Sequence, residues 1–128
     1  MILPPYARTL GIEIASGEAD TPRLSLPFSL DVVGRPGFLH GGAIAGLLEF
    51  AALAALRHVL ADDSVGIEPV TSTIDYMRGG RDKTTYAAGR VTRLGTRVAN
   101  VEAFAWQDAR DQLIAAARSN FLLVRPLA

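Results

Sequence analysis

A pair of glycines stands directly before the longest apolar stretch of the chain. Gly41 and Gly42 follow His40 and precede the stretch 43–56. Consecutive glycines at the start of a helix allow other groups to approach the backbone closely, and they leave unpaired N–H groups at the positive end of the helix dipole. Such groups suit a developing oxyanion or a polarised carbonyl. The sequence therefore predicts Gly41 and Gly42 as oxyanion-hole donors, with a pair that only shapes a tight loop as the alternative.

One carboxylate, Glu49, lies inside this otherwise apolar stretch. A carboxylate in apolar surroundings costs several kcal/mol unless it is paired, hydrogen-bonded or facing water. The sequence therefore predicts Glu49 as a general base. The alternative is a structural glutamate that a backbone group or an arginine satisfies.

The spacing between the glycines and the carboxylate limits how one chain can use both. Glu49 is seven residues beyond Gly42, which is about 10 Å along a helix at 1.5 Å per residue. One chain therefore cannot easily place its own Glu49 beside its own Gly42 amide. Two antiparallel helices that meet across a dimer interface would bring Glu49 of one chain opposite Gly42 of the other.

The elements that must position these residues follow from composition and pattern. The stretch 43–56 is rich in Ala and Leu and apolar on every side, which predicts a central buried helix too short and too charged to span a bilayer. Around it lie segments that alternate or are rich in β-branched and aromatic residues. They are 11–19, 23–29, 70–77, 85–93, 98–106 and 113–124.

The order of these elements predicts one α+β domain over residues 1–128, in which a curved antiparallel sheet wraps one long helix. The last four strands follow one another with connections of hairpin length. A sheet of this size leaves its edges and one face of the helix open, and a second copy would cover both. We therefore expect a homodimer or a dimer of dimers, that is, a homotetramer.

Composition excludes several functional classes. The 128 residues include 13 basic and 13 acidic side chains, so a net charge of zero argues against non-specific binding of nucleic acid or of an anionic membrane surface. With no cysteine and only two histidines, no metal site is expected. The first residues lack a basic stretch followed by a long apolar run, so we expect a cytoplasmic location.

The sequence around the glycine pair and Glu49 resembles the hotdog-fold acyl-CoA thioesterases of the phenylacetate-pathway type. The resemblance rests on the Gly-x-x-His-Gly-Gly pattern of residues 37–42 and on the carboxylate nine residues after the histidine. It extends to the segments 10–12, 24–27, 74–78 and 93–97, and thus over nearly the whole chain.

The resemblance implies hydrolysis of an acyl-CoA thioester at a site shared between two subunits, with coenzyme A as part of the substrate and no other cofactor. The Gly42 amide of one chain would hold the carbonyl oxygen, and Glu49 of the other would activate water or attack to give an anhydride. His40 would be a positioning residue at the mouth of the site. The alternative for His40 is a buried histidine that satisfies the loop backbone.

The sequence departs from the family pattern at two positions. Gly34 stands where an Asn or Gln is common, and Leu53 stands where a Ser or Thr is frequent. Hydroxyl groups on a neighbouring strand offer a replacement, and among them we select Thr73, although hydroxyl residues are also ordinary strand formers.

Cations at the rim of the site would bind the anionic phosphoadenosine end of coenzyme A. We expect Arg78 and Arg81, together with Lys83, to supply this charge after one strand, and Arg97, together with Arg93, to supply it at a later turn. A solvated basic face is the alternative.

Two other functions compete with thioester hydrolysis. Because Gly34 and Leu53 depart from the pattern, one alternative is a non-catalytic hotdog module that binds acyl-CoA. The other is a hotdog dehydratase or hydratase, which is disfavoured because such enzymes normally carry a catalytic histidine upstream of His40, and this chain has none there.

Overall fold

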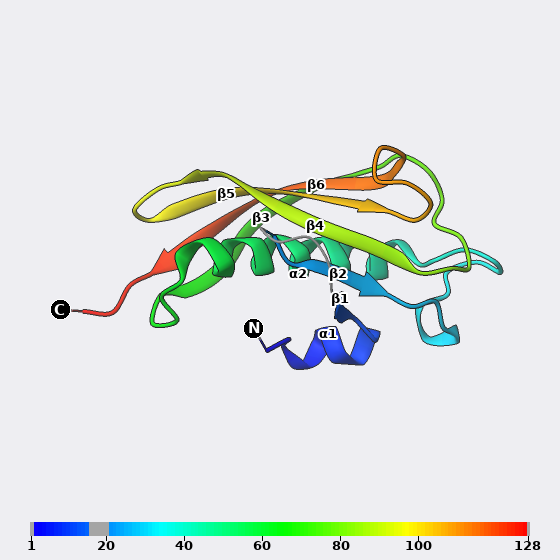
Figure 1. The fold of residues 1–128 in the computed structure, drawn as a ribbon, viewed down its shortest axis with the longest axis horizontal. Coiled ribbons are helices and arrows are strands. Elements are labelled where there is room, and N and C mark those ends of the chain that lie inside the picture. Colours follow the sequence, from blue (N-terminus) through cyan, green and yellow to red (C-terminus); the bar gives the residue numbers. More distant parts are fainter. Residues whose placement is uncertain (1, 16–20, 128) are drawn as a thin grey trace.

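The computed structural model describes residues 2–15 and 21–127 and shows one long helix lying against one curved antiparallel sheet (Figure 1). The α+β architecture predicted from the sequence is confirmed. The helices are α1 (Pro5–Leu10) and α2 (Gly41–Leu60), with a short 3-10 turn at Leu30–Val32. The strands are β1 (Glu13–Ala15), β2 (Arg23–Leu26), β3 (Gly66–Tyr76), β4 (Thr85–Leu94), β5 (Val98–Trp106) and β6 (Leu113–Val124).

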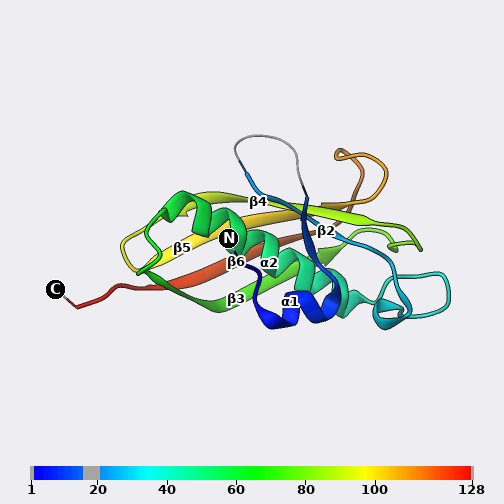
Figure 2. The same cartoon turned by 60° about the horizontal axis from the view of Figure 1, so that its bottom comes forward.

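The sheet has the strand order β1-β2-β4-β5-β6-β3, and every neighbouring pair is antiparallel. The expectation that the last four strands follow one another as hairpins is correct for β4, β5 and β6 and wrong for β3. This strand pairs with β6 at the edge, so residues 77–84 must cross the end of the sheet to reach β4. The crossing brings this loop to the end of the sheet at which α2 begins, as Figures 1 and 2 show.

Helix α2 is longer than the apolar stretch that predicted it, because the glycine pair and the segment 57–60 both join the helix. Ala61 ends it in a left-handed conformation, with φ of 57°. The expectation that this helix is too short and too charged to span a bilayer is wrong for its full length, since by length and composition alone its 20 residues suffice to cross a membrane; 56% of its most apolar part is, however, buried inside the chain. The helix thus has the burial of a core helix, which is the role predicted for it.

Small residues line the face of the sheet on which α2 packs. Gly89 on β4 is the tightest point, since a Cβ atom placed there would lie 2.7 Å from the Ala51 carbonyl oxygen and 2.9 Å from the Cβ of Ala55. Alanine occupies most of the other buried inward positions of the central strands. These are Ala87, Ala99, Ala103, Ala105, Ala115 and Ala117. The alanine-rich strands therefore let the helix approach the sheet closely.

The N-terminal region differs from the expected long first strand. Pro5, in the first turn of α1, suits a helix start because its fixed φ matches the helix and its missing N–H needs no partner. Gly11 ends α1 with φ of 85°. The strand predicted over 11–19 is confirmed only for Glu13–Ala15, and its residues 16–19 lie outside the described residues. At β3 the strand starts earlier than predicted, at Gly66.

Within the described residues, one face of α2 and the β3 edge of the sheet remain uncovered. Tyr6 of α1 packs against Phe50, with ring centroids 6.2 Å apart, and covers one side of the helix. Beside it, Ala45, Glu49 and Leu53 stay partly exposed. Strand β3 pairs with β6 on one side only. The structure thus presents both open surfaces on which the dimer prediction rests.

Candidate active site

The loop before α2 is fixed by backbone hydrogen bonds that lead the chain into the helix. The Gly34 N–H donates to the Phe38 carbonyl at 2.9 Å, and the His40 N–H donates to the Val32 carbonyl at 2.8 Å. Gly37 has φ of 78°, a conformation in which glycine is favoured because it has no Cβ. The loop between β3 and β4 also contacts this segment, since the Leu39 N–H donates to the Gly80 carbonyl at 2.8 Å.

His40 is the N-cap residue of α2, and its side chain contacts one of the predicted oxyanion-hole donors. The Gly42 N–H donates to His40 Nδ1 at 2.8 Å. His40 thus satisfies the loop backbone, as its alternative role predicted. The imidazole is exposed, however, and not buried as that alternative expected. The Gly42 N–H therefore has a partner in the substrate-free chain, and a substrate oxygen would have to replace that partner.

Tyr76 holds the carbonyl of the first glycine. It is the last residue of β3, and its hydroxyl donates to the Gly41 carbonyl oxygen at 3.1 Å. Its ring also packs on Gly41, where an added Cβ atom would lie 3.6 Å from the ring. The sequence analysis gave no role to Tyr76. The available signal was the strand alternation, which places Tyr76 on the same face as the half-buried Ile74.

Glu49 lies on the same face of α2 as Gly42, because a separation of seven positions is nearly two helical turns. Its side chain is half-buried, and among the described residues it has no hydrogen-bond or ion-pair partner. The alternative for Glu49 was a structural glutamate satisfied by a backbone group or an arginine, and the described residues supply neither partner. Since α2 is continuous from Gly41 to Leu60, the separation of about 10 Å along its axis holds.

The structure does not bring Thr73 to the helix. In the register of β3 with β6, Thr73 stands opposite the exposed Arg118, whereas Ser72 stands opposite the buried Ser119. Thr73 therefore lies on the outer face of the sheet, where it lines a hollow of about 440 Å³. Ser72 is the inward hydroxyl of this strand, and its Oγ lies 2.6 Å from Ser119 Oγ.

Two arginines stack on one phenylalanine next to the start of α2. The guanidinium carbons of Arg35 and Arg81 lie 4.0 and 4.3 Å from the centroid of the Phe38 ring. Such cation–π contacts hold a guanidinium in place and leave its N–H groups available to an anion. Arg81 is one of the cations predicted from the sequence, whereas Arg35 was not predicted. Arg78, also predicted, is exposed beyond the end of β3, at the same end of the sheet.

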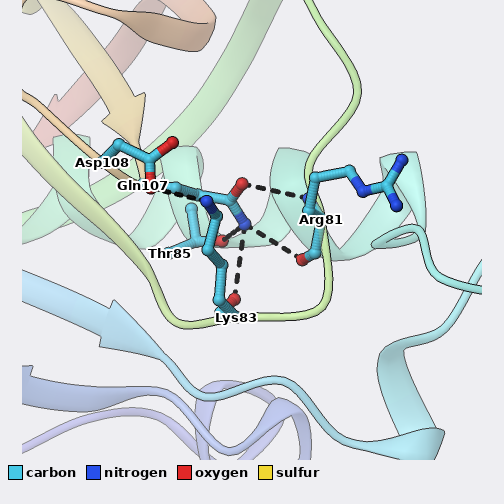
Figure 3. A network of polar contacts seen from close by, with 5 residues as sticks. All are labelled: Arg81, Lys83, Thr85, Gln107 and Asp108. Carbon is cyan, nitrogen blue, oxygen red and sulfur yellow. Dashed lines mark hydrogen bonds and ion pairs between the residues drawn. The ribbon is translucent and has the colours of Figure 1, made fainter.

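The loop that carries Arg81 is held by the side chain of Gln107, as Figure 3 shows. The Gln107 amide oxygen accepts from the Arg81 N–H at 3.0 Å, and its amide nitrogen donates to the carbonyls of Arg81 and Lys83 and to the Thr85 hydroxyl. Lys83 forms an exposed ion pair with Asp108. The backbone of Arg81 is thus fixed, while its guanidinium points away from this network.

Arg97 is distant from the other predicted cations within one chain. It follows β4 at the turn into β5, whereas Arg78 and Arg81 precede β4. The ten residues of β4 span about 30 Å at 3.3 Å per residue. The two ends are visible as opposite ends of the sheet in Figures 1 and 2. One chain therefore does not gather the predicted cationic rim into one cluster.

A partly apolar groove runs beside α2, one helical turn beyond Glu49. It has a volume of about 550 Å³, and its lining includes Leu53 of α2 and Ile67 of β3. Ile2 and Pro4 of the N-terminal segment and the charged side chains of Arg57 and Asp63 complete the wall. Among the residues that the structure describes, no group of three or more metal-ligating side chains occurs.

Comparison with known proteins gives a family for this arrangement. The sequence profile of the thioesterase superfamily matches residues 36–114, from the turn before α2 to the start of β6. A search of the curated proteins finds no significant match.

Solved structures share the fold over nearly the whole chain. A protein of Chromobacterium violaceum is 37% identical with a TM-score of 0.74, and the match covers 97% of this chain and 85% of that one. A thioesterase of Haemophilus influenzae is 19% identical with a TM-score of 0.84, covering 96% and 85%. A phenylacetic acid degradation-related protein of Ralstonia eutropha is 21% identical with a TM-score of 0.78, covering 95% and 92%.

These matches confirm the hotdog fold that the sequence resemblance implied. The family profile spans more than half of the chain and includes the glycine pair, Glu49 and the β3 strand end. The chain belongs to the thioesterase superfamily.

Proposed function

We propose that the protein hydrolyses an acyl-CoA thioester to the free acid and coenzyme A, at a site that two copies of the chain share. Membership of the thioesterase superfamily supports thioester hydrolysis as the class of reaction. The main observation in support of the proposed site is Glu49. It is a half-buried carboxylate without a partner among the described residues, and it lies on the same helix face as Gly42.

In the proposed reaction the Gly42 N–H donates to the thioester carbonyl oxygen and stabilises the charge that develops there. Glu49 of the other copy accepts a proton from water, whose oxygen attacks the carbonyl carbon. The C–S bond then breaks, and the thiolate of coenzyme A leaves and takes up a proton. Direct attack by Glu49, followed by hydrolysis of the anhydride, gives the same products.

The basic residues at the start of α2 support coenzyme A as the thiol part of the substrate. Arg35 and Arg81 both stack on the Phe38 ring, and Arg78 lies at the same end of the sheet. Guanidinium groups bind phosphate in a bidentate manner, so a fixed pair is suited to the phosphates of the nucleotide. The groove beside Leu53 and Ile67 supports an apolar acyl group, since it begins one helical turn from Glu49.

The open surfaces of the chain support the shared site. Because Glu49 is about 10 Å along the helix axis from Gly42, its carboxylate cannot easily reach an oxygen held at hydrogen-bonding distance from the Gly42 N–H of the same chain. A second copy that adds to the unpaired edge of β3 would cover the exposed face of α2 as well. The homotetramer and the cytoplasmic location stay predictions from the sequence.

A release assay for free thiol with aromatic and medium-chain acyl-CoAs tests the proposal. We expect turnover in the wild-type protein and a loss of about a hundredfold or more in Glu49→Gln, which conserves volume but removes the base. Glu13→Gln, on the exposed strand β1, is the matched control and should retain activity. Thermal melting of each variant establishes that the fold is intact. Undiminished turnover in folded Glu49→Gln would contradict the proposed role of Glu49.

A non-catalytic module that binds acyl-CoA is the second candidate function. It is favoured by the hydrogen bond from the Gly42 N–H to His40, which occupies the predicted oxyanion donor. In that case acyl-CoA would bind with a measurable affinity by calorimetry, but no acyl-CoA tested would release thiol above the uncatalysed rate.

A further inference from the structure

We propose that Tyr76 is a positioning residue for hydrolysis, because it fixes and polarises the peptide unit whose N–H is the oxyanion donor. This inference rests on the proposed function, since the N–H in question is that of Gly42. It assigns a role at the site to a side chain that comes from the sheet and not from the helix.

The position of Tyr76 follows from the register of β3. Tyr76 stands opposite Ala115 of β6, which is completely buried, so it lies on the inner face of the sheet. Because β3 ends there, the ring extends past the strand to the first turn of α2 and packs on Gly41. Its hydroxyl reaches the Gly41 carbonyl oxygen at 3.1 Å.

The Gly41 carbonyl and the Gly42 N–H are the two ends of one planar peptide unit. A hydrogen bond donated to the carbonyl oxygen draws electron density toward that end and makes the N–H a stronger donor, since hydrogen bonds in a chain polarise one another. The same bond fixes the orientation of the plane, and with it the direction in which the Gly42 N–H points.

The other end of this peptide unit is held by His40, whose Nδ1 accepts from the Gly42 N–H at 2.8 Å. When a thioester oxygen takes the place of the imidazole, the contact that orients the N–H end is lost. The bond from Tyr76 is on the carbonyl end and does not depend on His40. Tyr76 therefore adds to the constraint that the first turn of α2 places on this peptide unit, and this contact remains while the N–H changes partner.

A purely structural role makes a different prediction. Tyr76 is 54% exposed, so its hydrogen bond, like most exposed ones, adds little to the free energy of folding. If the hydroxyl acted only on stability or on substrate binding, its removal would leave kcat unchanged. A positioning role acts on the charge that develops in the transition state, so it lowers kcat and leaves KM nearly constant.

The test is the Tyr76→Phe variant, which keeps the ring on Gly41 and removes only the hydroxyl. We expect kcat to fall on the order of tenfold, with KM within about twofold of wild type, because the donor itself is retained and only weakened. Tyr86→Phe is the matched control, since Tyr86 alternates along β4 with Gly89, which packs on α2, and so lies on the other face of the sheet, where its ring stacks on Trp106. An unchanged kcat, or a change confined to KM, would overturn the proposal.

A spectroscopic measurement tests the same role without turnover. An acyl-CoA labelled with ¹³C at the thioester carbonyl is bound to Glu49→Gln, and the infrared difference spectrum reports how strongly the protein polarises that carbonyl. We expect a shift to lower wavenumber that is reduced when Tyr76→Phe is added. Equal shifts in the two proteins would overturn the role of Tyr76.

The outcomes distinguish this inference from the proposed function. If wild type bound acyl-CoA without hydrolysing it, the proposed function would fail, and the infrared shift would still decide whether Tyr76 strengthens the Gly42 N–H as a donor to the bound carbonyl. If Glu49→Gln remained active while Tyr76→Phe lost activity, the base would be reassigned and Tyr76 would stand.

Discussion

His40 connects the loop to the helix, and its side chain satisfies one of the N–H groups that every helix start leaves open. We predict that His40→Ala lowers the free energy of unfolding by about 1 kcal/mol, the usual cost of losing an N-cap. His40→Asn should retain most of the stability, because its amide oxygen can accept from the same backbone group. Urea denaturation of the three proteins measures both effects. Equal stability of His40→Ala and wild type would show that the imidazole does not cap α2 in solution.

The residues of the site differ in how far the sequence predicts them. Gly41, Gly42 and Glu49 are recognisable because their types and spacing carry the chemistry within one local segment. Tyr76 is not, because its contact with Gly41 joins positions 35 residues apart and depends on where β3 ends relative to α2. Thr73 shows the same limit, since a shift of one residue along a strand moves a side chain to the other face of the sheet.

At the scale of elements, the fit of α2 on the sheet depends on the absence of a side chain at Gly89. An added Cβ atom would lie 2.7 Å from the Ala51 carbonyl oxygen, a backbone atom that cannot move without the helix. We predict that Gly89→Ala lowers the free energy of unfolding by about 1–3 kcal/mol, as overpacking of a core does. Gly41→Ala is the control for stability, since its Cβ atom would meet only the Tyr76 ring, at 3.6 Å. If urea denaturation gave both variants wild-type stability, the close contact of helix and sheet would be wrong.

The elements themselves are largely predictable, and their order in the sheet is not. Alanine and leucine over 43–56 favour a helix, and alternation within 98–106 and 113–124 favours strands, so these elements are present with nearly the predicted bounds. The place of β3 beside β6 is set by pairing between distant parts of the chain. The lengths of the connections do not reveal this pairing. The short helix α1 was missed because six residues carry too little periodic pattern.

The proposed site needs a second copy of the chain to be complete. The single chain leaves the edge of β3 unpaired and keeps Glu49 about 10 Å along the helix from the Gly42 N–H. It also keeps Arg97 at the opposite end of β4 from Arg78 and Arg81. Both separations are found within one chain. An arrangement of two antiparallel copies of α2 would bring Glu49 of one copy close to the Gly42 N–H of the other.

The most direct test of the shared site mixes two inactive variants. Glu49→Gln removes the base, and Gly42→Pro removes the backbone donor, at a position in the first helical turn where the N–H has no intrahelical acceptor. Gly42→Ala, which keeps the N–H, is the control for the added side chain. Melting and sedimentation establish that each variant is folded and assembled before the variants are unfolded together, refolded and assayed for thiol release.

If each site draws Glu49 from one chain and Gly42 from the other, a mixed dimer has one site with both lesions and one site with neither. The shared site predicts that each mixed dimer regains about half of the wild-type activity, since one of its two symmetry-related sites is intact. If both residues served a site from the same chain, every site would carry one lesion. Activity equal to the sum of the two variants, in a sample that native mass spectrometry shows to contain mixed dimers, would contradict the shared site.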